Sequence, residues 1–181
     1  MSLERPVAPD PYALLPKVAS FTVTSPDITD GEPLDLLYVV GPDGPGGGNE
    51  SPALALSGFP AGTQSFAVSC FDPDAPTPSG YWHWAVVDIP AEVTALARNA
   101  GRADGSGLPP GPFQARTDGG NVGYEGAGPP QGDQVHRYFF VVHAVDVPTL
   151  GVTPDTGATA VSFNLVFHTL ARAIIAPVFS Y

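Results

Sequence analysis

Chain breakers set the main limit on how this sequence can fold. Glycine occupies 21 and proline 22 of its 181 positions, so 43 residues disfavour the interior of regular elements. Proline removes a backbone N–H donor, and glycine loses more conformational entropy than any other residue when it is fixed. Such a sequence leaves little room for long helices and favours short strands joined by turns. We therefore predict a mostly-β fold, a sandwich or a barrel.

The length and the apolar content indicate one domain with a proper core. Hydrophobic residues make up 43% of the chain and charged residues 14%, which is typical of a globular protein rather than a disordered one. A chain of 181 residues usually forms a single domain. We expect residues 1–15, rich in proline and alanine, to be a loosely attached arm and residues 16–181 to form the domain.

Runs of strand-forming residues are short and are separated by turn residues. We expect strands at 21–24, 34–40, 53–56, 65–71, 83–89 and 135–145, and helices at 90–98 and 162–175. Residues 41–48 lack the Gly-Lys-Ser/Thr ending of a phosphate-binding loop, so we expect a surface connection there. Residues 102–132 form a long polar stretch of the kind that often carries function.

The acidic charge balance excludes some classes of partner. Seven basic and 18 acidic residues give a net charge of −11, which repels nucleic acid and disfavours attraction to an anionic bilayer. A local pocket for one anion remains compatible with this charge, because nearby donors outweigh distant carboxylates. We find no apolar run of the ~18 residues that a membrane span needs and no signal-peptide pattern, so we expect a cytoplasmic protein. Cys70 has no partner cysteine and lies in an apolar run, where we expect an inert core residue.

A first group of polar side chains surrounds the end of one predicted strand. The turn Asp72–Pro76 carries two carboxylates, and His83 follows it between Trp82 and Trp84. Because alternate side chains of a strand share a face, we expect both tryptophans to point one way and His83 the other. The sequence leaves open whether His83 fills the core or faces a pocket.

A second group lies downstream. Residues 126–130 form a glycine-rich turn, and His136 and Tyr138 then share one face of a predicted strand, with Arg137 on the other. Exposed backbone N–H groups of the glycines, beside a His and a Tyr, are typical of an anion site.

The carboxylates of the Asp72–Pro76 turn would repel an anion. We expect Asp72 and Asp74 to accept a hydrogen bond from an imidazole, which fixes its tautomer and favours its charged form. An ordinary capped turn is the alternative interpretation.

Together these motifs resemble the phosphatidylethanolamine-binding proteins, and specifically their bacterial branch of Raf kinase inhibitor-like proteins. The resemblance runs from about residue 16 to the C-terminus. It implies a large antiparallel sheet packed on a smaller one, a few short helices with one near the C-terminus, and a pocket that takes phosphate, phosphorylated headgroups or small carboxylates. Carried over position by position, it implies a pocket wall of Asp72, Asp74, Pro76, His83, Gly126, Gly128, Pro129, His136 and Tyr138. Arg137 is expected to form a structural ion pair with a carboxylate of the turn.

The function expected from these residues is binding of a small anionic or phosphorylated ligand, without a cofactor and with a protein partner as a further expectation. One alternative is a protease or kinase inhibitor acting through a surface loop such as 102–118. A second is a weak hydrolase in which His83 or His136 acts with Asp74 as acid and base. We find no positioned nucleophile and no Gly-x-Ser-x-Gly motif, so we expect no enzyme.

The histidines and the aromatic residues lead to three further expectations. A zinc ion held by His83, His136 and an aspartate is compatible by ligand type, although we expect no metal. His143 and His168 match no motif and are expected to be structural. A homodimer is expected from bacterial relatives and from aromatic residues near Tyr12 and Phe113.

Overall fold

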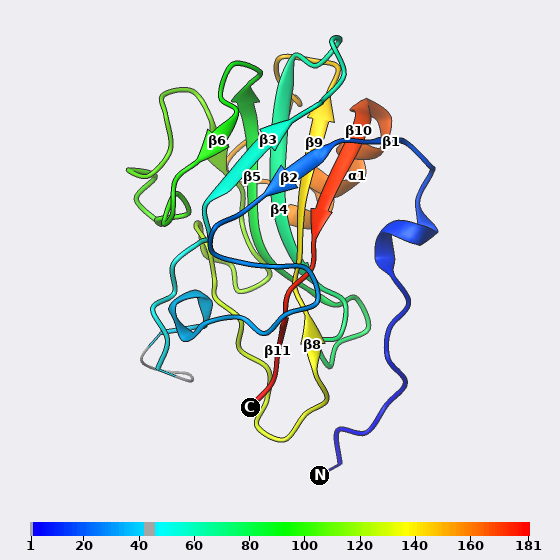
Figure 1. The fold of residues 1–181 in the computed structure, drawn as a ribbon, viewed down its shortest axis with the longest axis vertical. Coiled ribbons are helices and arrows are strands. Elements are labelled where there is room, and N and C mark those ends of the chain that lie inside the picture. The colour runs from blue at the N-terminus through cyan, green and yellow to red at the C-terminus, as the bar shows by residue number, and fades with distance from the viewer. Residues whose placement is uncertain (1, 42–45) are drawn as a thin grey trace.

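Two β-sheets pack face to face in the computed structural model, which describes residues 2–41 and 46–181 (Figure 1). Positions 42–45 of the surface connection expected at 41–48 lie outside the described residues. The strands are β1 (Ala19–Ser20), β2 (Thr22–Thr24), β3 (Leu54–Ser57), β4 (Ser65–Asp72), β5 (Tyr81–Pro90), β6 (Ala95–Leu96), β7 (Phe113–Gln114), β8 (His136–Arg137), β9 (Phe139–Val145), β10 (Thr169–Ile175) and β11 (Val178–Phe179). The helices are the 3₁₀ turns η1 (Pro11–Leu14) and η2 (Leu36–Tyr38) and the α-helix α1 (Ala158–His168).

The larger sheet has the strand order β1-β10-β9-β4-β5-β7, and the smaller one has the order β2-β3-β6. Neighbouring strands from β10 to β7 are antiparallel, whereas β1 pairs with β10 in parallel. A separate ribbon, β8 with β11, extends one end of the molecule (Figure 1). The mostly-β prediction, with a large sheet on a small one and one helix near the C-terminus, is confirmed.

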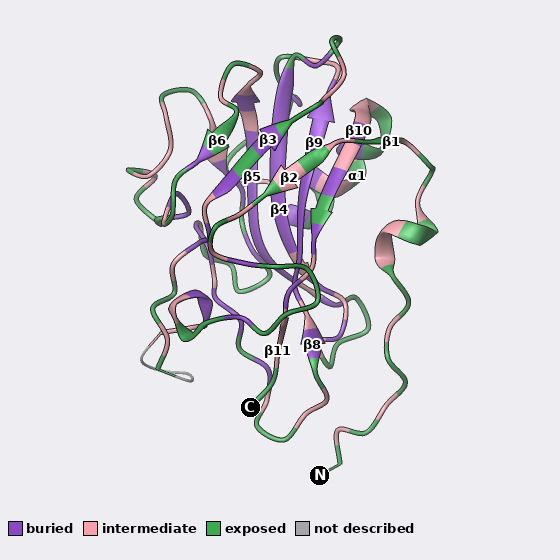
Figure 2. Cartoon of the chain, in the orientation of Figure 1, coloured by how far each residue is buried: buried purple, intermediate pink, exposed green. Residues whose placement is uncertain are grey.

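Both faces of the larger sheet are covered. On one face, Phe66, Trp84 and Phe140 pack against Leu54 and Leu56 of the smaller sheet. On the other face, α1 covers a second apolar cluster that includes Trp82 and Val87. The central strands are therefore buried: Figure 2 colours β4, β5 and β9 as buried along nearly their whole length. Among the described residues no helix is long and apolar enough to cross a membrane.

The single helix expected at 162–175 is wrong in its second half. The helix ends at His168, and Thr169–Ile175 forms β10 between β1 and β9. An apolar run of this kind fits a helix or a strand by periodicity alone. Strand partners on both sides, which lie far away in sequence, decide the outcome here.

Three other expected elements are corrected. The segment 90–98 is no helix, since β6 lies within it and pairs with β3. The strand expected at 34–40 is replaced by η2, whose first turn is capped by the Asp35 side chain. The strand expected at 135–145 is interrupted at Tyr138, whose backbone N–H donates to the Pro177 carbonyl at 2.9 Å.

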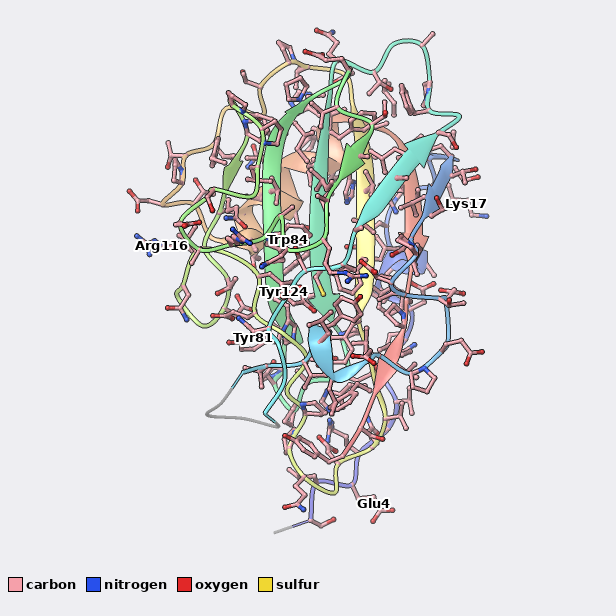
Figure 3. The ribbon with its side chains drawn as sticks, turned by 60° about the vertical axis from the view of Figure 1, so that its left-hand side comes forward. Glu4, Lys17, Tyr81, Trp84, Arg116 and Tyr124 are labelled. Atoms are coloured by element: carbon pink, nitrogen blue, oxygen red, sulfur yellow. The ribbon has the colours of Figure 1, made fainter. Side chains whose placement is uncertain are left out.

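The N-terminal arm, residues 2–15, lies along the side of the domain (Figure 1). In Figure 3, Glu4 lies at the lower end of the molecule and Lys17 lies higher up, on its right-hand side. The Tyr12 ring packs 6.1 Å from Phe139 and 6.2 Å from His143, and the Arg172 guanidinium lies 5.5 Å from its centroid. The arm thus contacts the same face of the large sheet as α1.

The aromatic residues that suggested a homodimer are partly covered by other residues of the domain. Tyr12 packs against the sheet as described, and Phe113 packs against the cluster under α1. Both side chains are half-buried rather than exposed, so they do not support the homodimer, which stays a prediction. Exposed aromatic side chains occur instead on α1, where Phe163 and Phe167 are each 66% exposed.

We predict that Tyr12→Ala lowers the free energy of unfolding by roughly 1–2 kcal/mol, because the half-buried Tyr12 ring loses its contacts with Phe139 and His143. Urea unfolding measures the change. Leu14→Ala is the matched control, because Leu14 in the same 3₁₀ turn is 71% exposed and should leave the midpoint unchanged. Equal stability of both variants and the wild type would show that the arm is loosely attached.

Candidate functional site

A pocket of about 630 Å³ opens at the end of the large sheet where β4 ends and β5 begins. Of the residues predicted for its wall, Asp72, Pro76, His83, Gly126, Gly128 and His136 line it. Asp74, Pro129 and Tyr138 do not. The other lining residues are Val40, Gly41, Asn49, Ala75, Thr77, Tyr81, Gly119, Asn121, Glu125 and Pro130.

A β-bulge places His83 on the pocket wall. Cys70 pairs with Trp84 and Phe71 pairs with Trp82, so His83 is an extra residue between two consecutive pairs. The two tryptophans therefore lie on opposite faces, Trp84 between the sheets and Trp82 under α1. The expectation that they share a face is wrong, because alternation fails across a bulge.

His83 is held as a neutral hydrogen-bond acceptor. Its Nδ1 lies 2.9 Å from the Glu125 carbonyl oxygen, which only accepts, so Nδ1 carries the hydrogen. Burial lowers the pKa of His83 below its ordinary value, against the opposing charges of Asp72 and Glu125. The neutral ring then presents the Nε2 lone pair, and no hydrogen bond to Nε2 occurs among the residues that the structure describes.

His136 is in the opposite state. Its Nδ1 lies 2.7 Å from Asp72 Oδ2 and its Nε2 lies 3.0 Å from Asp133 Oδ2. Burial lowers the pKa of His136, but the hydrogen bonds and charges of the two aspartates outweigh this effect and raise it above the ordinary value. With a carboxylate on each nitrogen, both ring N–H groups donate and the charged imidazolium is favoured.

The N-terminal arm reaches this cluster through Arg5. Its guanidinium donates to both carboxylate oxygens of Asp133, at 2.7 and 2.9 Å, and also contacts the Asp74 carbonyl. The Arg5 hydrogen bond lowers the pKa of Asp133 well below its usual range. Arg5 Nη2 lies 3.4 Å from His136 Nε2. No local pattern in the sequence predicts this contact between residues 5 and 133.

Asp74 belongs to a structural ion pair rather than to the pocket wall. Arg137 donates to it from Nε at 2.7 Å and from Nη2 at 2.8 Å, and the Asp74 side chain is 0% exposed. Burial raises the pKa of Asp74, but the Arg137 hydrogen bonds outweigh it and lower the value. The prediction for Arg137 is confirmed, and Asp74 as a wall residue is corrected because its carboxylate is used by Arg137.

Tyr138 lies behind the two histidines. Its ring centroid is 5.2 Å from that of His83 and 6.5 Å from that of His136, and the residue is 1% exposed. Its buried hydroxyl forms no hydrogen bond within the described residues. Tyr138 is thus a support for the site, and the expectation that it lines the wall is corrected.

The glycine-rich turn contributes close packing rather than free N–H donors. Gly126 N–H donates to Asn49 Oδ1 at 2.8 Å. It is therefore not the free donor to a ligand that the sequence predicted. A Cβ at Gly126 would come within 2.4 Å of the backbone of Val39 and Val40. Pro129 is buried, and Pro130 lines the pocket beside it.

Glu125 and its neighbours form a part of the wall that the sequence did not reveal. Tyr81 donates from its hydroxyl to Glu125 Oε2 at 3.2 Å, and Asn121 Nδ2 donates to Oε1 at 2.7 Å. Figure 3 shows Tyr81 at the lower end of β5, below Trp84. These residues come from a long loop and a strand end, where no periodic pattern marks them.

The remaining candidate groups lie away from this chemistry. Within residues 2–41 and 46–181, no group of three His, Cys, Asp or Glu side chains could hold a metal ion. Cys70 is fully buried as predicted, and burial raises the pKa of its thiol. His143 is buried against Thr169, where burial lowers its pKa to about 3, and His168 pairs with Asp146.

Comparison with known proteins agrees with this architecture. The family model described as phosphatidylethanolamine-binding protein matches residues 24–180. The Escherichia coli UPF0098 protein YbcL is 47% identical over 90% of this chain and 89% of its own length. UPF0098 protein YbhB, also from E. coli, is 47% identical over 86% of this chain and 98% of its own length. The crystal structure of YbcL, described as a new member of the mammalian PEBP family, superposes with a TM-score of 0.87 and covers 90% of this chain and 99% of its own.

We predict that Asp74→Asn lowers the free energy of unfolding by about 3 kcal/mol at neutral pH, because it leaves Arg137 without its buried partner. Since the pKa of Asp74 is lowered in the fold, its contribution is present above the unfolded value of ~3.9 and is lost as pH falls below it. Urea unfolding at pH 7 and at pH 3 measures both effects. Asp155→Asn is the control, because that exposed pair with Arg116 should change stability by less than ~1 kcal/mol. Equal losses in the two variants would contradict the assignment.

Proposed function

The chain belongs to the phosphatidylethanolamine-binding protein family, and we propose that it binds a small ligand with an anionic group, a phosphate ester or a carboxylate, in this pocket. His136 receives the anionic end. Asp72 keeps His136 charged by accepting from Nδ1, and His83 lines the same pocket as an acceptor for donor groups of the ligand.

The observation that carries this proposal is the buried His136 imidazole on the pocket wall, with a carboxylate on each ring nitrogen that favours its charged form. The Asp72 and His136 side chains are 3% and 1% exposed, so their hydrogen bond lies in a medium of low polarity, where charged donors bind oxyanions strongly. The Asp133 carboxylate already occupies Nε2, which supports the view that an oxyanion suits this position. A ligand oxyanion competes with Asp133 for the same donor.

The charges around the pocket favour a singly charged oxyanion. Asp72 and Glu125 line the pocket, and its lining residues in the described chain include neither Lys nor Arg. His136 therefore meets two carboxylates, Asp72 and Asp133, with Arg5 beyond them. A phosphodiester or a carboxylate adds less repulsion here than a doubly charged phosphate monoester.

The hydroxyl groups of the pocket support binding rather than covalent catalysis. Thr77 lines the pocket, but its Oγ1 donates to the Gly80 carbonyl at 2.6 Å rather than to an imidazole. Tyr81 donates to Glu125. Thr77 has no base beside its hydroxyl, and burial beside Glu125 raises the pKa of Tyr81 to about 12, so neither hydroxyl is activated as a nucleophile. We therefore propose a binding protein in preference to a hydrolase.

We predict that binding of dimethyl phosphate, followed by calorimetry, weakens as pH rises through the raised pKa of His136, above ~6.5. This probe keeps one negative charge throughout, so the change reports on the protein. His136→Gln should lose about 1.5–3 kcal/mol of binding free energy and the pH dependence together. His168→Gln is the matched control and should bind as the wild type does, because His168 pairs with Asp146 and does not line the pocket. Identical, pH-independent affinity of all three proteins would refute the anion site.

A further inference from the structure

We propose that the N-terminal arm controls access to the anion site through a latch, in which Arg5 of the arm holds Asp133 against His136. An anion binds His136 only after this latch opens, so docking of the arm and binding of the ligand exclude each other. The inference rests on the proposed function, because it concerns the same donor on His136. It adds a role for residues 2–15, which lie outside the segment 24–180 that matches the family.

While the latch is closed, both ring nitrogens of His136 are occupied. Asp72 accepts from Nδ1 at 2.7 Å and Asp133 from Nε2 at 3.0 Å. Asp72 is the last residue of β4 and also accepts from the Asp74 backbone N–H at 2.8 Å, so the sheet fixes its place. Asp133 comes instead from the loop that precedes β8. Asp133 is therefore the partner that a ligand oxyanion replaces.

Arg5 fastens Asp133 in this position. Its guanidinium donates to both carboxylate oxygens, at 2.7 and 2.9 Å, and this two-pronged geometry is the strongest that Arg forms with a carboxylate. The same group donates to the Asp74 carbonyl, which ties the pair to the turn after β4. The Asp133 side chain is 1% exposed and the Arg5 side chain 24%, so water screens the pair less than it screens a surface pair.

The loop that carries Asp133 has room to move. Its Gly132 has a φ of +77°, and a Cβ there would meet no atom within 4 Å. Residues 131 and 132 are exposed, and Val135 is 52% exposed. A cavity of about 400 Å³ lies between residues 2–5 of the arm and residues 131–134. Asp133 can therefore leave His136 by a local motion that does not disturb the core.

The arm has a second anchor outside the pocket. The Tyr12 ring packs 6.1 Å from Phe139, and the Arg172 guanidinium lies 5.5 Å from its centroid. Between the two anchors, the Ala8 backbone N–H donates to Asp74 Oδ1 at 3.3 Å. Figure 1 shows the arm running down one side of the domain to the end where β8 lies. Loss of the Tyr12 contact therefore loosens the latch without changing a residue of the pocket wall.

The test uses the direction of change in Arg5→Gln. This substitution removes a positive charge close to the anion site, so Coulomb attraction alone predicts weaker binding of an anion. The latch predicts the opposite, because Asp133 loses the group that holds it on His136. Calorimetry of dimethyl phosphate at pH 6 should show affinity about tenfold higher than in the wild type, the size expected of one charge-assisted hydrogen bond.

Three further variants separate the latch from charge and from folding defects. Tyr12→Ala removes no charge and should also raise the affinity, because it releases the second anchor. Arg5→Lys keeps the charge but not the two-pronged geometry, and its affinity should lie between those of the wild type and Arg5→Gln. Lys17→Gln is the matched charge control. Lys17 is exposed and lines neither cavity, so its loss should leave the affinity unchanged.

Thermodynamic linkage supplies a second measurement on the unaltered protein. If docking of the arm weakens ligand binding, the ligand must weaken docking of the arm by the same factor. Hydrogen exchange followed by mass spectrometry should therefore be faster in residues 8–13 at saturating dimethyl phosphate. The segment contains the Ala8 N–H that bonds to Asp74 and the Tyr12 anchor. Exchange in β9, which lies in the core of the sheet, should not change.

Several results would overturn the latch. Weaker binding by Arg5→Gln, with slower exchange of the arm in the presence of ligand, would show that Arg5 binds the anion itself. Equal affinity of the wild type and Arg5→Gln would show that Arg5 does not restrain Asp133, and a Tyr12→Ala protein that binds as the wild type does would reject the role of the arm. All these results leave the anion site standing. Failure of dimethyl phosphate to bind any of the proteins would reject the proposed function and this inference with it.

Discussion

The hydrogen bond between Asp72 and His136 is the interaction on which the rest of the site depends. It joins the last residue of β4 to the first residue of β8, and both side chains are almost completely buried. Burial of charge is costly unless each charge is paired and hydrogen-bonded. Asp133 and Arg5 complete the cluster, with one guanidinium and one imidazolium facing two carboxylates. One network of ion pairs therefore joins the N-terminal arm to the end of the large sheet and to the pocket.

The two pocket histidines differ because their partners differ. His136 faces a carboxylate on each nitrogen, which favours its charge, whereas His83 faces a backbone carbonyl on one nitrogen and burial disfavours its charge. The same side-chain type thus supplies a charged donor at one place and a neutral acceptor at another. The negative charge of Glu125 beside His83 opposes this division, but burial outweighs it.

The sequence predicted the fold class and most of the pocket because these follow from local signals. Breaker content and short apolar runs indicate a β-protein, and the two clusters around His83 and His136 bring their polar residues to one end of the sheet. Other features depend on pairing between distant segments. The bulge at His83 arises from the register of β5 against β4, and the strand at 169–175 from partners on both sides. The contact of Arg5 with Asp133 and the place of Glu125 have no local signature, so they required the structure.

The protonation state of the two imidazoles in the free protein tests this account most directly. Nitrogen NMR of the histidine side chains across a pH titration measures each pKa and identifies which ring nitrogen carries hydrogen. We expect His136 to titrate above ~6.5 with both nitrogens protonated below that point, and His83 to titrate below it with hydrogen on Nδ1. Asp72→Asn should lower the pKa of His136. A His136 that is neutral at pH 6, or that titrates below His83, would contradict the central claim.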